Sequence, residues 1–245
     1  MKLLEGLIMI IDVNAINKID MTDFPFSSNP ERYLFLAKKD KTDFVYNTAA
    51  LEGNAMTYPE VETLLDGITV GGHKLSDEQQ VLNQARSLDL LFELIAENKF
   101  MLNKTILCSL HAQVAKDEAL QWGLFRDGNV NIGGTEYMPP QATHLNDLFR
   151  MGVAEVLEIK HPVLQAISYF LFGARSQFFY DGNKRTSRLM MNGVLLSSGF
   201  PMLNIKAKDK LAFNTMMLNF YDSGDYLIAV TFLLDYYISQ NIHLK

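Results

Sequence analysis

A short polar turn between two apolar segments is the feature that most restricts how this chain can fold. Val163–Phe172 and Leu189–Leu196 have almost no polar face, which is typical of helices buried at the centre of a domain. Between them, residues 177–188 read Gln-Phe-Phe-Tyr-Asp-Gly-Asn-Lys-Arg-Thr-Ser-Arg. The pattern predicts two central helices joined by a charged turn, and the second helix begins at about Lys184.

The turn contains the groups that bind phosphate. The first N–H groups of a helix lack internal partners and the helix dipole adds positive charge, so helix starts bind anions. Gly182 lets an anion approach the backbone. Full positive charges follow at Lys184, Arg185 and Arg188. Asp181 beside a phosphate is explained if it holds Mg²⁺, which binds one or two carboxylates together with phosphate oxygens.

Most of the remaining chain has helical periodicity, and one segment does not. Asn129–Ile132 and Thr135–Met138 flank Gly133-Gly134, which is typical of a β-hairpin closed by a two-residue glycine turn. The residues therefore predict an all-α domain with one small β-hairpin. Helices are expected within 31–56 and at 59–65, 77–98, 106–114, 143–160, 162–172, 184–198, 206–221 and 225–240, with Ser76 as the N-cap of the third.

Taken alone, Asp-Gly-Asn-Lys-Arg fits an ordinary loop between helices better than a binding site. The extended pattern Phe179-x-Asp181-Gly182-Asn183-Lys184-Arg185-x-x-Arg188 is more specific. It resembles the Fic family signature His-x-Phe-x-(Asp/Glu)-Gly-Asn-(Gly/Lys)-Arg-x-x-Arg. Thr48-x-x-x-Glu52-Gly53 resembles that family's inhibitory helix motif, and residues 132–140 resemble its flap hairpin. The three motifs stand in the family's order and cover roughly residues 30–240.

The resemblance implies a Fic-type helical bundle with a small β-hairpin flap. We expect residues 1–30 to form an N-terminal arm and residues 31–245 to form one Fic/Fido domain. That domain would contain an inhibitory helix near 45–55, the flap near 128–139 and the Fic motif at 177–188.

Roles for individual residues also follow from the resemblance. Asp181 would hold Mg²⁺, and Arg188 would bind the terminal phosphate of ATP. The other phosphates would be held by Gly182, Asn183, Lys184 and Arg185. The implied reaction is the family's usual one, transfer of AMP from ATP to a protein Ser, Thr or Tyr.

The flap would hold an extended segment of the target protein by strand addition and present its hydroxyl. Its candidate contact residues are Ile132, Gly133, Gly134, Thr135 and Tyr137. The inhibitory motif consists of Thr48, Glu52 and Gly53, and a Glu52 carboxylate paired with Arg188 would occupy the group that the γ-phosphate needs. Phe213–Tyr221 carries aromatic and methionine side chains that are more typical of a core than of an adenine pocket.

Gln177 departs from the family pattern, which has a catalytic histidine there that takes the proton from the attacking hydroxyl. An amide does not titrate near neutral pH and cannot be a general base, and losing such a base costs about 10²–10⁴ in rate. None of the five histidines lies in the motif, and we expect His111 to pack between helices. The sequence leaves open whether this is a nucleotide-binding member with little transferase activity or a chain carrying a substitution.

Lys184 is a second departure, because AMP-transferring members commonly have glycine there. The Doc branch of the family also has lysine and transfers phosphate instead. Glu52 and Gly182 keep AMP transfer as the leading expectation. The alternatives are a catalytically inactive nucleotide-binding or protein-binding module, a Doc-like phosphotransferase and a hydrolase that removes AMP.

Charge and composition restrict the partners. A net charge of −6 argues against a nucleic-acid-binding surface, and the single Cys108 excludes an internal disulfide. Met1–Ile11 contains Glu5 and no cleavage pattern, and no run approaches the ~20 apolar residues of a membrane span. We therefore expect a cytoplasmic protein whose partners are ATP and a target protein, without membrane or nucleic acid. Homo-oligomerisation stays an open alternative.

Overall fold

A computed structural model describes residues 10–245, and the expectation of no signal peptide in Met1–Ile11 falls mostly outside them. The described residues are helical and contain no strand. The α-helices are α1 (Val13–Ile16), α2 (Pro30–Lys39), α3 (Lys41–Leu51), α4 (Tyr58–Leu65), α5 (Leu75–Ala96), α6 (Lys104–Val114), α7 (Leu145–Leu157), α8 (Pro162–Ser176), α9 (Asn183–Ser197), α10 (Lys210–Ser223) and α11 (Tyr226–Asn241). Short 3₁₀ turns occur at Ala142–His144, Ala207–Asp209 and Ile242–Leu244.

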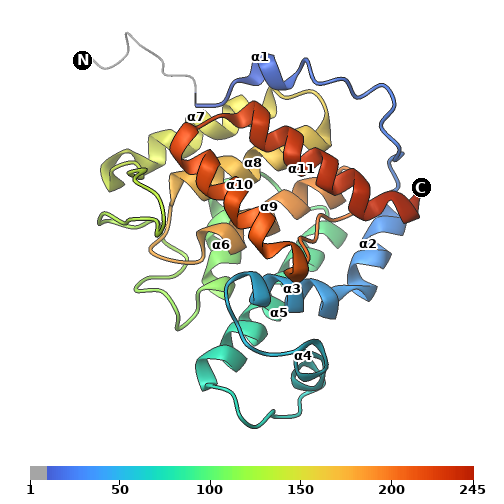
Figure 1. The fold of residues 1–245 in the computed structure, drawn as a ribbon, viewed down its shortest axis with the longest axis vertical. Helices are drawn as coiled ribbons and strands as arrows, with labels where there is room; N and C mark the ends of the chain where they lie inside the picture. The colour runs from blue at the N-terminus through green and yellow to red at the C-terminus, as the bar shows by residue number, and fades with distance from the viewer. Residues whose placement is uncertain (1–9) are drawn as a thin grey trace.

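The two predicted central helices, α8 and α9, form the middle of the bundle. Nearly every residue of both is buried, which explains why neither shows a polar face in the sequence. Figure 1 shows α10 and α11 crossing in front of them, with α6, α5 and α3 on the lower side. The prediction of an all-α domain is confirmed.

Helix α3 is held in place by the segment that leads into α10. Asn47 Oδ1 accepts a hydrogen bond from the Ala207 amide at 2.8 Å, and Lys206 pairs with Asp43. Lys210 Nζ donates to the Ala50 carbonyl at 2.8 Å, near the end of α3. The end of α3 and the residues after it are therefore fixed beside the start of α10.

The segment before α2 packs on the bundle from residue 10 onward. The Ile11 amide donates to the Glu155 carboxylate at 2.8 Å, and Phe26 is buried. The Asn29 amide donates to the Gly199 carbonyl at 2.7 Å. The segment runs across the top of Figure 1 and down one side to α2. The boundary at residue 30 stays a prediction.

The predicted β-hairpin is wrong. Residues 128–139 contain a turn at Gly133-Gly134, but the two arms do not pair as strands. Instead, the Gly128 carbonyl accepts from Arg126 at the base of the segment, and the Thr135 hydroxyl donates to Asp222 of α10 near its middle. A lone two-stranded hairpin is marginal by itself, so contacts with the bundle determine the shape of this segment.

Two helix starts also differ from the sequence prediction. The third predicted helix begins at Leu75 with Lys74 at the N-cap position, so the expected Ser76 cap is wrong. Helix α10 begins at Lys210 rather than at residue 206, because a 3₁₀ turn at Ala207–Asp209 precedes it. Both errors lie within a few residues of helix ends, where alternative first turns compete closely.

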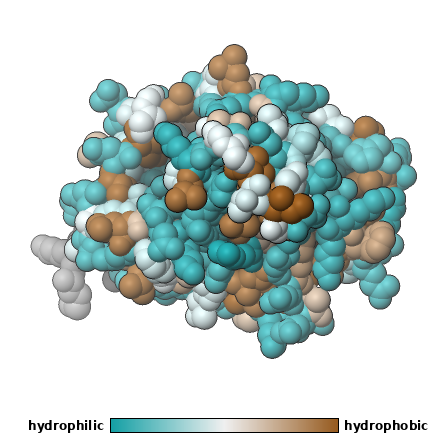
Figure 2. Space-filling model, turned by 90° about the horizontal axis from the view of Figure 1, so that it is seen from below, coloured by the Kyte–Doolittle hydropathy of each residue, from teal (hydrophilic) through white to brown (hydrophobic). Residues whose placement is uncertain are grey.

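The surface seen from below mixes apolar and hydrophilic residues without separating them (Figure 2). Among the helices at residues 10–245, none combines the length and apolar character that crossing a bilayer requires.

Candidate functional site

A cavity of about 380 Å³ opens at the start of α9. Its size falls in the range of about 300–1,000 Å³ typical of small-molecule sites. Four parts of the chain line it, far apart in sequence: the residue after α3, the 128–139 segment, the motif turn and one face of α10. The lining residues are Glu52, Asn131, Ile132, Gly133, Gln177, Tyr180, Asp181, Gly182, Asn183, Lys184, Arg185, Asn214, Met217, Leu218 and Tyr221.

The motif turn is shaped by two left-handed residues and one amide. Gln177 ends α8 with φ 48° and Gly182 precedes α9 with φ 73°. The Asn183 side chain accepts from the Phe179 amide at 2.9 Å and donates to the Phe179 carbonyl at 2.8 Å. The Asn183 side chain therefore closes the turn on itself, and the phosphate contact expected of Asn183 stays a prediction.

Both close packing and a positive φ require glycine at position 182. A Cβ there would lie 3.3–3.5 Å from side-chain atoms of Val114, Ala115 and His111, at a φ that L residues rarely adopt. His111 is fully buried and its Nε2 is 2.9 Å from the Asp181 carbonyl oxygen, while its Nδ1 accepts from the Gly123 amide. The donating nitrogen is therefore Nε2.

His111 is a structural histidine and not a substitute base. Its ring stacks on Phe179, with centroids 3.6 Å apart and planes within 5°. Burial lowers the pKa of His111 to about 4, and this outweighs the opposing effect of the bond to Asp181. The ring is neutral at pH 7, and both of its nitrogens are engaged by the backbone. The expected packing of His111 is confirmed.

Gln177 lines the cavity, but its side chain is tied to the turn. Its Nε2 donates to the Ala174 carbonyl at 2.7 Å, and its Oε1 accepts from Asn183 Nδ2 at 3.0 Å. Neither group can take up a proton near neutral pH. The position has the placement that the motif predicts and lacks the chemistry of a base.

Arg188 pairs with Glu52, as the sequence hypothesis required. Arg188 Nη2 lies 2.9 Å from Glu52 Oε1, and Lys184 Nζ lies 3.5 Å from the other carboxylate oxygen. The Arg188 side chain is only 2% exposed, and its Nε and Nη1 have no hydrogen-bond partner within residues 10–245. Glu52 lines the cavity and covers Arg188, which does not reach its surface.

The Glu52 carboxyl is strongly acidic. Burial would raise its pKa, but the neighbouring cations outweigh burial and lower the pKa from 4.5 to about 2. Those cations are Arg188, Lys184 and Arg185. Thr48, one turn earlier, is buried on α3, and Gly53 turns the chain after it with φ 94°. Of the three residues of the predicted inhibitory motif, Glu52 alone contacts the motif arginine through its side chain.

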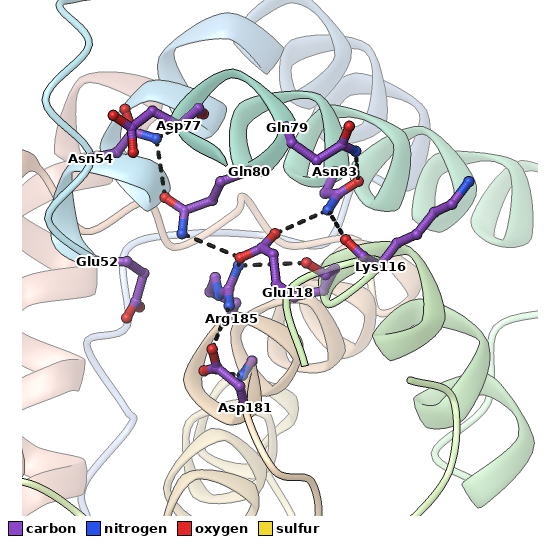
Figure 3. Close-up of polar contacts among 12 residues, drawn as sticks. Glu52, Asn54, Asp77, Gln79, Gln80, Asn83, Lys116, Glu118, Asp181 and Arg185 are labelled. Atoms are coloured by element: carbon purple, nitrogen blue, oxygen red, sulfur yellow. Dashed lines mark hydrogen bonds and ion pairs between the residues drawn. The ribbon is translucent and has the colours of Figure 1, made fainter. Parts of the chain in front are cut away.

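Arg185 has its own carboxylate partner, which the sequence analysis missed. Arg185 Nη1 lies 2.7 Å from Glu118 Oε2, and its side chain is 4% exposed. Figure 3 shows Glu118 held in turn by two side chains of α5: Asn83 donates to Oε1 at 2.9 Å and Gln80 to Oε2 at 3.4 Å. Gln80 also accepts from Asn54. Glu118 lies 67 residues from Arg185, and no local pattern marks it.

Asp181 is the residue at which Mg²⁺ was predicted. Its side chain is 62% exposed at the cavity, with Oδ2 3.6 Å from Arg185 Nη2. Residues 10–245 contain no cluster of three or more His, Cys, Asp or Glu placed to hold a metal. One accessible carboxylate fits Mg²⁺ that takes its other ligands from phosphate oxygens and water.

The predicted flap residues divide into two groups. Ile132 and Gly133 line the cavity. Thr135 donates from its hydroxyl to Asp222 of α10, and Tyr137 stacks over Tyr221, with ring planes within 9°. These two residues anchor the segment to α10, and Gly134 with φ 83° makes the turn between the groups.

Residues 101–195 match the model of the Fic/DOC family. A protein named protein adenylyltransferase Fic from Aedes aegypti is 25% identical over 235 residues, covering 92% of this chain and 46% of that protein. One of the same name from Drosophila ananassae is 26% identical over 234 residues, with the same coverage. The chain spans about half the length of these curated relatives.

Solved structures share the fold. Fic-1 from C. elegans superimposes with a TM-score of 0.76 at 16% identity, over 96% of this chain and 70% of that one. A Fic-domain signalling protein from Bacteroides thetaiotaomicron has a TM-score of 0.65 at 22% identity, over 94% and 97%. The family match, the relatives and the shared fold all support a protein of the Fic family.

Proposed function

We propose that this chain binds ATP with Mg²⁺ in the cavity and transfers AMP to a hydroxyl of a target protein, under the restraint of Glu52. The observation that carries the proposal is the start of α9. Lys184 and Arg185 line a cavity there, and Arg188 lies buried behind one carboxylate. A triphosphate matches this set of cations at a helix N-terminus. The names of the curated relatives support the reaction class.

In the proposed reaction, the oxygen of the target hydroxyl forms a bond to the α-phosphorus of ATP. The bond from that phosphorus to the oxygen bridging the α- and β-phosphates breaks, and pyrophosphate leaves with the bridging oxygen. Lys184 and the first amides of α9 stabilise charge on the phosphate oxygens. Mg²⁺ held by Asp181 would neutralise charge on the leaving phosphates. The hydroxyl proton must pass to a base.

Glu52 restrains this reaction because it occupies the arginine that the terminal phosphate needs. The cavity end of α9 carries three cations, and the carboxylates of Glu52, Glu118 and Asp181 stand opposite them. A bound triphosphate must either displace Glu52 or lie in another pose. The second pose leaves the α-phosphorus misplaced, and small misplacements of reacting groups are costly in rate.

Gln177 limits the proton-transfer step. Because its amide cannot accept the proton, water must do so, and we expect the transfer rate to be about 10²–10⁴ below that of a histidine variant. The same observation favours a second candidate, a Fic module that binds ATP and a protein without turnover. In that module, the bonds of Gln177 to Ala174 and Asn183 would serve only to hold the turn.

The target protein would dock on the 128–139 segment, whose Ile132 and Gly133 lie at the cavity mouth. Unpaired backbone groups of an irregular segment can accept an extended peptide, which supports docking by main-chain hydrogen bonds. A target docked there would present its hydroxyl over the cavity at the start of α9.

The test combines Gln177→His with Glu52→Gly and supplies ATP labelled at the α-phosphate. We expect the double variant to label itself or proteins in a lysate at about 10²–10⁴ times the rate of Glu52→Gly alone. ATP labelled at the γ-phosphate distinguishes phosphate transfer, which would leave label only in that arm.

The matched control is Glu52→Gly with Gln177→Asn, which changes the side chain without supplying a base. Calorimetry on the unmodified chain measures ATP binding, and Arg185→Ala should weaken it. If the histidine double variant binds ATP but transfers neither AMP nor the γ-phosphate, the transferase function is wrong and the binding module remains. If ATP does not bind either, both candidates are wrong.

A further inference from the structure

Arg126 is a buried cation outside the Fic motif, placed at the base of the 128–139 segment. Its residue is 2% exposed, and no carboxylate pairs with it within residues 10–245. A buried charge without an acidic partner is unfavourable unless its donors are satisfied by hydrogen bonds. The structure must therefore compensate this guanidinium in another way.

Three backbone carbonyls provide the compensation. Arg126 Nε donates to the Gln177 carbonyl at 2.6 Å, Nη1 donates to the Gly128 carbonyl at 2.6 Å, and Nη2 donates to the Pro140 carbonyl. Gly128 and Pro140 stand at the two ends of the segment that was expected to form a hairpin. Because no strand pairing closes that segment, one rigid guanidinium fork joins its ends.

Further bonds fix the base of the segment to the motif. The Arg126 amide donates to the Phe178 carbonyl at 2.9 Å. The Tyr180 hydroxyl donates to Asp127 at 2.5 Å, and its oxygen lies only 2.7 Å from where a Cβ on Gly128 would be. Residues 126–128 therefore lie alongside residues 177–180 and are hydrogen-bonded to them.

The Gln177 carbonyl, which accepts from Arg126 Nε, belongs to a residue with an unfavourable backbone conformation. Gln177 has φ 48° and ψ 60°, a left-handed conformation that costs of order 1 kcal/mol for a residue other than glycine. The bond from Arg126 Nε fixes the orientation of this peptide group. That orientation turns the chain out of α8 and directs the side chain at position 177 toward the cavity.

We propose that Arg126 is a positioning residue that sets the side chain at position 177 and the target-docking segment as one unit. The two parts must be in register for transfer, because the docking segment would present the hydroxyl and a histidine at position 177, as in Gln177→His, would receive its proton. Without Arg126, each can move independently of the other. The consequence for transfer rests on the proposed function, whereas the coupling of the two segments does not.

The test of the coupling is independent of activity. Lysine at position 126 keeps the charge but presents a single ammonium, which cannot bond to three separated carbonyls in fork geometry. In Arg126→Lys, NMR relaxation of backbone amides should show faster motion both in residues 127–139 and in residues 177–180. Amides of α8 and α9 beyond the turn should be unchanged. Thr135→Val is the control, because it removes only the bonds of the Thr135 hydroxyl, to Asp222 and to the Tyr137 amide, and should affect the 128–139 segment alone.

Motion in only one of the two segments, or an equal loss of order throughout the chain, would overturn the proposal. The unmodified protein provides a reading that needs no variant. The three hydrogen bonds should stop the Arg126 guanidinium from rotating freely, so its Nε–H and Nη protons should give slowly exchanging NMR signals. A freely rotating guanidinium would also overturn the proposal.

The second arm measures transfer in the Gln177→His, Glu52→Gly background. Arg126→Lys should lower kcat/KM for the target protein by about 10²-fold, the scale of a misplacement of about 1 Å. The dissociation constant of ATP should not change, because Arg126 contacts none of residues 182–188 through its side chain. A background without transfer would refute the proposed function, and the NMR result would still decide the coupling. An unchanged kcat/KM would refute the positioning role.

Discussion

Two arginines three residues apart on α9 each pair with a glutamate from outside the helix, and the two pairs differ in how the glutamate is held. Glu118, the partner of Arg185, receives further hydrogen bonds from Asn83 and Gln80 of α5 and does not line the cavity. Glu52, the partner of Arg188, lines the cavity, and its carboxylate contacts only Arg188 and Lys184 within residues 10–245.

The difference assigns separate tasks to two residues that look equivalent in the motif. A carboxylate inside a satisfied network is expensive to remove, so the Arg185–Glu118 pair belongs to the framework of the bundle. A carboxylate at the wall of a cavity can exchange with another anion. The Arg188–Glu52 pair is therefore the one that the triphosphate of the proposed function would open.

The largest effect is expected from Glu118→Ala. It leaves the Arg185 guanidinium buried without its partner, and breaking such pairs costs about 3–5 kcal/mol of unfolding free energy. Urea denaturation measures the loss. Glu93→Ala, an exposed change on α5, is the control and should stay within about 0.5 kcal/mol. If Glu118→Ala lowers the unfolding free energy no more than the control does, the two arginine–glutamate pairs do not differ in the way described above.

Acidification should release the Glu52 pair next. The pKa of Glu52 is about 2 in the folded chain and 4.5 ordinarily, so the unfolded state binds the proton more readily. The carboxylate then contributes stability above pH 4.5 and loses that contribution as the pH falls from 4.5 toward 2, by up to about 3 kcal/mol.

Urea titrations of the unmodified chain and of Glu52→Gln across that pH range isolate the effect. The difference in unfolding free energy between the two should be constant above pH 5 and should shrink toward pH 2. A difference that does not depend on pH would mean that Arg188 does not stabilise the ionised carboxylate.

The smallest effect is expected from Lys184→Met. Its ammonium is 3.5 Å from Glu52 and its side chain is 32% exposed, so the pair contributes at most about 1 kcal/mol. The acid transition of Glu52 should move to higher pH, because one of the cations that lower its pKa is gone. The measurement is the same urea titration, with the exposed Lys39→Met as control. Complete loss of the acid transition, as in Glu52→Gln, would make Lys184, and not Arg188, the main partner.

The sequence predicted the two central helices and the turn between them because both depend on neighbouring residues. The apolar character of α8 and α9 follows from their burial, and Gly182 is needed at a left-handed position that begins a helix. The pairing of Glu52 with Arg188 was also anticipated, although only through the resemblance of two separated motifs to a family.

The sequence did not predict the closure of the 128–139 segment or the partner of Arg185. Alternation around Gly133-Gly134 resembles a hairpin, yet whether two arms pair depends on competing hydrogen-bond partners. Here these are the Asp222 carboxylate, which accepts from Thr135, and the Arg126 guanidinium, which donates to the Gly128 carbonyl. Glu118 and Arg126 have no neighbours in sequence that mark them as special.

What the sequence determined alone is a helical bundle with a buried pair of helices and a cationic turn at their junction. Apolar periodicity and helix-start chemistry act over a few residues, so they can be read locally. Only the tertiary structure decided which carboxylate meets each arginine, and that Arg126 joins the ends of an unpaired loop to Gln177. Contacts between residues 51 to 136 positions apart have no local signature, because their energy depends on how the whole chain packs.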